Sequence, residues 1–192
     1  MLIAFNKPYG VICQFSPSAG KPTLKDFVDV PDIYPAGRLD TDSEGLLMLT
    51  DDGILQARIA EPARKIVKTY WVQVEGEPTD AELDPLRIGI NLGDFTAAPA
   101  KAKMLSPPKD LWPRNPPVRF RQSIPTAWLE ISISEGKNRQ IRRMTAKVGY
   151  PTLRLIRMSI GAWSLGNLES GTWRVETVPA DLVRRVNSGK KP

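Results

Sequence analysis

The stretch AGRLDTDSEGLLMLTDDG, residues 36–53, predicts a turn, a strand and the start of a helix in immediate succession. LLMLT (46–50) is too short for a helix of its own and suits a buried strand. Thr50 is then placed to cap a helix over ILQARIA (54–60), and the two aspartates after Thr50 face the positive end of that helix. The stretch therefore predicts a core strand that is preceded by a carboxylate-rich turn.

Two further strands show the same kind of local signal. KTYWVQVEG (68–76) alternates, with Tyr70 among its inward-facing residues, and TAWLEISISEG (126–136) alternates in the same way. Other predicted elements are a strand at 2–5, helices at 21–30, 80–90 and 178–186, a sharp turn into a helix within 134–149, and a late strand at 171–178. Strands and helices do not alternate regularly, so the expected class is α+β with a largely antiparallel sheet.

The composition excludes several kinds of chemistry. The 192 residues include no histidine and one cysteine, Cys13, so neither Ser-His-Asp nor Cys-His catalysis is available, nor a zinc site built from such ligands. The formal net charge of +6 favours an anionic partner such as nucleic acid or an acidic membrane surface. No signal peptide and no apolar run of about 20 residues are present, which predicts a cytoplasmic protein that does not enter a membrane.

The acids of the opening stretch resemble a calcium-binding loop at first sight. Asp40, Asp42, Glu44 and Asp51 occupy acidic positions of that pattern. However, the prolines in residues 30–39 oppose the helix that must enter such a loop, and its last ligand position holds Asp rather than Glu. A calcium-binding module is therefore the weaker alternative.

Taken one by one, the acids have different expected roles. The last two aspartates belong to the helix start, and Asp42 and Glu44 are expected to face solvent. Asp40 remains, held in a turn before a buried strand, where a cation would keep it ionised as a nucleophile or base needs. An ordinary structural salt bridge is the alternative for Asp40.

A helix rich in arginine offers the cations. Its apolar stripe is expected inward, and Arg139, Arg143 and Lys147 are expected on the opposite side, where they meet phosphates. Arg142 lies on the flank, from which a guanidinium reaches a partly buried carboxylate. A solvated basic face is the alternative.

A proline-rich segment, residues 104–128, is predicted to lack regular structure. Trp112 and Arg114 within it suit base stacking and phosphate neutralisation. The alternative is a proline-stiffened crossover with solvated arginines.

Five motifs occur in the order NKPYGV, GRLDTDSEGLLMLTDDG, KTYWVQVEG, SEGKNRQIRRM and LRLIRMSIG. Together they resemble the motifs of the RsuA-type RNA pseudouridine synthases, from about residue 2 to residue 178. The combination of SEGLL, LWPRNPP and SIPTAWL looks most like the E-type branch of that family, which modifies large-subunit ribosomal RNA.

The resemblance implies both a reaction and a site. The family breaks the glycosidic bond of uridine, turns the uracil and rejoins it through C5, without metal or cofactor. Asp40 would be the catalytic aspartate, Tyr70 would stack on the base and help to remove the C5 proton, Arg142 would pair with Asp40, and Leu155 would line the base pocket. The other expected substrate-binding residues are Arg38, Lys137, Arg139, Arg143, Lys147, Trp112 and Arg114.

The expected organisation is a single catalytic domain over residues 1–192 with the pseudouridine synthase fold. Its mixed, largely antiparallel sheet is split into subdomains at about 1–65 and 66–180, with a catalytic cleft between them and a basic tail at 187–192. No N-terminal S4-like domain is expected. A monomer acting on large-subunit ribosomal RNA is the predicted function, and a non-catalytic RNA-binding or ribosome-assembly factor is the alternative.

Overall fold

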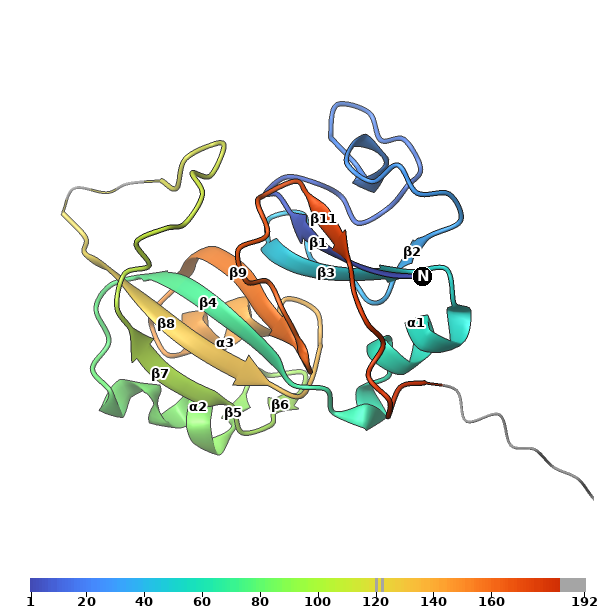
Figure 1. Ribbon diagram of the computed structural model, residues 1–192. Helices are drawn as coiled ribbons and strands as arrows, with labels where there is room; N and C mark the ends of the chain where they lie inside the picture. The colour runs from blue at the N-terminus through green and yellow to red at the C-terminus, as the bar shows by residue number, and fades with distance from the viewer. Residues whose placement is uncertain (120, 122, 184–192) are drawn as a thin grey trace, which may run out of the picture.

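The computed structural model describes residues 1–119, 121 and 123–183, and its centre is one mixed sheet in the order β11-β1-β3-β9-β4-β8-β7 (Figure 1). The strands of this sheet are β1 (Leu2–Lys7), β3 (Glu44–Thr50), β4 (Lys68–Glu75), β7 (Lys101–Leu105), β8 (Thr126–Ile133), β9 (Thr152–Ile160) and β11 (Trp173–Val175). Two short strands, β2 (Tyr34–Pro35) and β10 (Trp163–Ser164), extend it. The predicted α+β class with a largely antiparallel sheet is confirmed.

The helices are short and lie around this sheet. They are α1 (Gly53–Ala60), α2 (Asp84–Ile88) and α3 (Gln140–Lys147), with single turns η1 (Leu24–Asp26), η2 (Pro62–Arg64) and η3 (Ala81–Leu83). A separate ribbon consists of β5 (Ile90–Asn91) and β6 (Thr96–Ala97). Within the described ranges, none of the helices has the length and apolar character needed to cross a bilayer.

The two halves of the sheet meet at a narrow parallel contact between β3 and β9. Only two residue pairs form it, Glu44 with Ile156 and Gly45 with Arg157, whereas β4 and β8 pair along eight residues each. Near its C-terminus the chain returns to the half of the sheet that contains β1 and β3, where β11 pairs with β1. The subdomain division near residue 65 stays a prediction.

Gly45 permits this contact. Its φ of 97° lies in the left-handed region, and a Cβ there would be 2.8 Å from the backbone nitrogen of Arg157 and closer still to its carbonyl oxygen. The positive φ and the close approach of Arg157 both exclude a side chain at position 45. Any residue other than glycine would have a strained backbone and would push β3 away from β9.

We expect Gly45→Ala to lower the free energy of unfolding by about 2 to 3 kcal/mol, from backbone strain plus overpacking. Urea unfolding measures the change. Gly53→Ala is the matched control, because the added Cβ meets nothing within 4 Å at the start of α1 and alanine favours helix. Equal stability of the two variants would contradict the role of Gly45.

Other boundaries differ from the expectations. The helix predicted after a sharp turn within 134–149 begins at Gln140, and the helix over 21–30 is reduced to the single turn η1. The helix predicted over 178–186 is wrong for 178–183, where Pro179 to Leu182 form a hydrogen-bonded turn. The rest of that helix and the basic tail lie outside the described residues.

The core forms on both faces of the sheet. One face carries two clusters: α2 and α3 cover the half around β4 and β8, and residues 11–33 cover the half around β1 and β3. The apolar side chains on the other face of the sheet pack against α1 and against residues 163–182. On the first face the two covers leave a gap over the junction of β3, β9 and β4, and the candidate site lies there.

Candidate active site

A cavity of about 1100 Å³ occupies the gap between the two covers. Its floor includes Leu155 and Arg157 from β9 and Lys68 and Tyr70 from β4. Its walls come from three loops that are distant in sequence, residues 9–14, 36–43 and 136–141, and from residues 59–62. The cavity therefore gathers most of the predicted motifs into one place.

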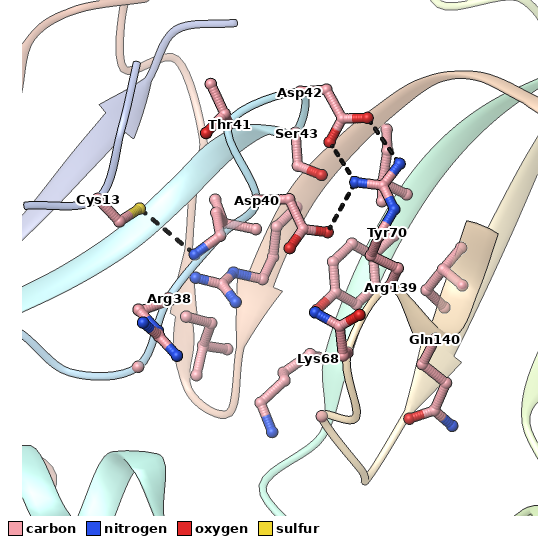
Figure 2. Close-up of a pocket in the computed structure, with 18 of the residues that line it drawn as sticks. Cys13, Arg38, Asp40, Thr41, Asp42, Ser43, Lys68, Tyr70, Arg139 and Gln140 are labelled. Atoms are coloured by element: carbon pink, nitrogen blue, oxygen red, sulfur yellow. Dashed lines mark hydrogen bonds and ion pairs between the residues drawn. The ribbon is translucent and has the colours of Figure 1, made fainter. Parts of the chain in front are cut away.

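Asp40 lies on the wall, in the turn that enters β3. The turn is held by hydrogen bonds from the Leu39 amide to the Cys13 sulfur at 3.4 Å and from the Ser43 amide to the Asp40 carbonyl at 3.0 Å. The Asp40 side chain is 33% exposed, and its Oδ2 lies 3.7 Å from the Arg139 guanidinium (Figure 2). Asp40 is thus fixed, paired and open to the cavity.

The partner of Asp40 is Arg139, so the predicted pairing with Arg142 is wrong. Arg139 also forms two hydrogen bonds with the Asp42 carboxylate, at 2.9 and 2.8 Å. Arg142 donates instead to the Asp42 carbonyl at 2.6 Å and lies 3.5 Å from its carboxylate. The reason is the backbone of Arg139, whose φ of 49° at the start of α3 turns its side chain toward residues 36–43, the aspartate loop.

The contacts among Asp42, Arg139 and Arg142 determine the electrostatics of this wall of the cavity. Burial alone would raise the pKa of Asp42, but the hydrogen bonds from Arg139 and the charges of both arginines lower it. Burial lowers the pKa of Arg142, against the attraction of Asp42. Asp42 therefore joins α3 to the aspartate loop and, contrary to prediction, does not simply face solvent.

Lys7, at the end of β1, also holds the loop that carries Asp40. It is completely buried, and its Nζ donates to the carbonyls of Pro8, Val11 and Thr41 at 2.8, 2.9 and 3.4 Å. Burial lowers its pKa to about 8, although Cys13 and nearby carboxylates oppose the shift. One side chain thus ties the first strand to the residue after Asp40.

Lys7 makes the stability depend on pH. Its pKa is about 8 when folded and 10.5 as a free side chain, so the unfolded chain binds more protons in this window and the contribution of Lys7 to stability rises with pH. We expect the difference in unfolding free energy between the natural protein and Lys7→Met to grow by about 2 kcal/mol from about pH 8 to about pH 10. Urea unfolding at both pH values measures it.

The control is Lys25→Met, at an exposed position of η1. Its difference from the natural protein should stay constant over the same range. A constant difference for Lys7→Met would contradict the shifted pKa.

Glu44 is buried and paired, so its predicted exposure to solvent is wrong. It is 1% exposed and forms two hydrogen bonds of 2.8 Å with Arg154. The Trp112 indole donates to the same carboxylate at 2.8 Å, and the Trp112 carbonyl accepts from Arg154 at 3.0 Å. Trp112 therefore fastens the proline-rich segment to the sheet, and it lies outside the cavity. Its contact with RNA stays a prediction.

Of the last two acids of the stretch, Asp52 has the expected role at the helix start and Asp51 does not. Asp52, not Thr50, caps α1 by accepting hydrogen bonds from the amides of Ile54 and Leu55. Asp51 pairs with the N-terminal amine. Within residues 1–119, 121 and 123–183, no group of three or more His, Cys, Asp or Glu residues is arranged to hold a metal ion.

The remaining predicted residues divide into two groups. Tyr70, Leu155, Arg38 and Lys137 line the cavity together with Asp40 and Arg139. Arg143, Lys147 and Arg114 lie outside it: Arg143 pairs with Asp94, and the Arg114 guanidinium stacks on Tyr9, 4.3 Å from the ring centre.

Two cations on the floor, Lys68 and Arg157, were not predicted from the sequence. Both belong to strands of the central sheet, and β9 itself was not predicted as a strand. The available signal was that Arg157 follows Leu155 by two residues, which places both on one face of a strand.

A carboxylate, an aromatic ring and several cations around one open cavity suit an enzyme that receives an unstacked base. The sequence pattern described as RNA pseudouridylate synthase matches residues 1–147. The chain belongs to the RNA pseudouridine synthase family.

Particular relatives agree with this. A protein of Xanthomonas campestris pv. campestris named Ribosomal large subunit pseudouridine synthase E is 55% identical over 182 residues, covering 94% of this chain and 97% of its own. A protein of Vibrio vulnificus with the same name is 55% identical, covering 93% and 76%. A crystal structure of a pseudouridylate synthase matches with a TM-score of 0.76 and 31% identity, covering 92% of this chain and 70% of the other.

Proposed function

We propose that this protein isomerises uridine to pseudouridine in large-subunit ribosomal RNA. The observation that carries the proposal is the placement of Asp40, Tyr70 and Leu155 around one cavity, although they come from distant parts of the chain. The names of the relatives that are 55% identical support the large subunit as the source of the substrate.

Each residue has a role in this proposal. Asp40 is the catalytic carboxylate, and the Arg139 guanidinium pairs with it at 3.7 Å. Tyr70 stacks on the flipped uracil, and Leu155 packs against it. Arg142 becomes a positioning residue, because it holds the aspartate loop through the Asp42 backbone.

The cations at the cavity mouth would receive the RNA strand. Arg38 and Lys137 are exposed and line the cavity, so they are placed to neutralise phosphates on either side of the flipped nucleotide. The reaction as proposed needs no metal or cofactor, and the proposed working form is a single cytoplasmic catalytic domain acting as a monomer.

The direct experiment treats unmodified large-subunit ribosomal RNA with the purified protein and maps pseudouridine by chemical modification. One or a few modified positions are expected, and the same positions should lack pseudouridine in cells without the gene. RNA binding without pseudouridine in either setting would favour a non-catalytic assembly factor instead.

A further inference from the structure

Arg157 is a buried cation with an unused donor. The residue is 4% exposed, and its Nε donates to the Leu46 carbonyl at 2.8 Å. Its Nη2 is buried and has no hydrogen-bond partner within the part of the chain that the structure describes, yet the residue lines the cavity. Since an unsatisfied buried donor costs about 1 to 3 kcal/mol, this arrangement points to a ligand that supplies the missing acceptor.

The sheet register puts this donor beside the proposed base site. Arg157 on β9 is paired with Tyr70 on β4, and Leu155 is paired with Val72. Side chains of directly paired residues share a face, as do residues two apart in one strand, so Leu155, Arg157 and Tyr70 share the cavity floor. The floor therefore combines an apolar side chain, an aromatic ring and a hydrogen-bond donor at neighbouring positions.

The floor is also positively charged. Burial, and then the charge of Arg157, lower the pKa of Lys68, whose Nζ donates to the carbonyls of Ile66 and Glu135. Among the described residues, neither Arg157 nor Lys68 forms an ion pair, whereas Asp42 on the wall is neutralised by Arg139. An acceptor that gains negative charge at the floor would thus be stabilised there.

We propose that Arg157 Nη2 donates a hydrogen bond to a carbonyl oxygen of the flipped uracil and stabilises the charge that the ring acquires when it leaves the ribose. The inference rests on the proposed function. When the C1′–N1 bond breaks with its electron pair on the ring, the uracil carries one negative charge, spread over N1 and its carbonyl oxygens. That pair forms the C5–C1′ bond, the C5 proton leaves and N1 takes up a proton, so Arg157 exchanges neither protons nor electrons.

The test compares Arg157→Met and Arg157→Lys with the natural protein in single-turnover reactions on unmodified ribosomal RNA. Removing one such donor should slow the chemical step about 100-fold in Arg157→Met. RNA affinity should be little changed, because the buried group does not reach the phosphates, and Arg157→Lys should be intermediate because it keeps the charge. The matched control is Arg87→Met, which removes an arginine of α2 outside the cavity and should leave the rate unchanged.

A second measurement separates contact from structure and identifies the oxygen. RNA with 2-thiouridine or 4-thiouridine at the target replaces one carbonyl oxygen by sulfur, a poorer acceptor. The thio substitution at the contacted position should slow the natural protein about tenfold but hardly slow Arg157→Met or Arg157→Lys further, since contacting groups are not additive. If Arg157→Met does not fold, the thio substitutions measured with Arg157→Lys test the contact between Arg157 and the carbonyl oxygen.

The outcomes are distinct. Three results would overturn the role of Arg157 and leave the proposed function intact. These are variant rates equal to the rate of the natural protein, equal thio effects in all proteins, and a loss of RNA affinity as large as the loss of rate. Absence of pseudouridine with the natural protein would instead overturn the proposed function, and the inference with it.

Discussion

Asp40→Asn should abolish pseudouridine formation, with a fall in the single-turnover rate of about 10⁴-fold or more, as when a group central to covalent chemistry is removed. Asparagine keeps the size of the side chain, and the turn before β3 is held by the backbone amides of Leu39 and Ser43, so the turn should persist. What it removes is the negative charge that faces Arg139 at 3.7 Å. Mapping pseudouridine in ribosomal RNA at a series of times measures the rate.

RNA binding provides the first control for Asp40→Asn. Loss of a negative charge cannot weaken attraction to phosphates, so affinity should be equal or higher. Asp51→Asn provides the second, because Asp51 belongs to the same acidic stretch but pairs with the N-terminal amine outside the cavity. Comparable rates for Asp40→Asn and Asp51→Asn would show that Asp40 is not catalytic.

Arg154→Met should lower the free energy of unfolding by about 3 to 5 kcal/mol, the usual cost of leaving one partner of a buried ion pair alone. The Arg154 and Glu44 side chains are 8% and 1% exposed, so solvent would not compensate Glu44. Glu44 also lies beside Gly45, at the narrow contact between β3 and β9. The loss should therefore loosen the junction beneath the cavity.

The double variant Glu44→Met/Arg154→Met tests the cause. Because it removes both charges and keeps apolar volume, it should recover most of the lost stability. Urea unfolding of the natural protein, the single variant and the double variant gives the three values. A single variant within about 1 kcal/mol of the natural protein would mean that the pair acts like an exposed one.

Local patterns in the sequence predicted much of the sheet. Alternation in residues 68–76 and 126–136 corresponds to β4 and β8, and LLMLT falls within β3. Strand β9 was not predicted, because Arg154 and Arg157 interrupt its apolar pattern and both are nevertheless buried. Their charges are accommodated by partners and a cavity that no local pattern reveals.

The candidate site shows the same division between local and long-range information. The turn before a buried strand was enough to single out Asp40, because that reasoning uses only neighbouring residues. Its partner was misassigned, because Arg139 lies 99 positions away in the sequence and its orientation depends on the left-handed backbone at the start of α3. The acids at 42 and 44 were misassigned for the same reason, since their cations come from α3 and β9.

The sequence by itself therefore determined the strands with clear alternation, the net positive charge and the carboxylate in the turn before β3. It also excluded the catalysis and the zinc sites that depend on histidine. Only the tertiary structure decided which cation meets which carboxylate, and that one donor of Arg157 on the cavity floor lacks a partner among the described residues. The physical reason is that periodicity assigns a side chain to a face of its own element, whereas pairing depends on which distant elements the folded sheet brings within hydrogen-bond distance.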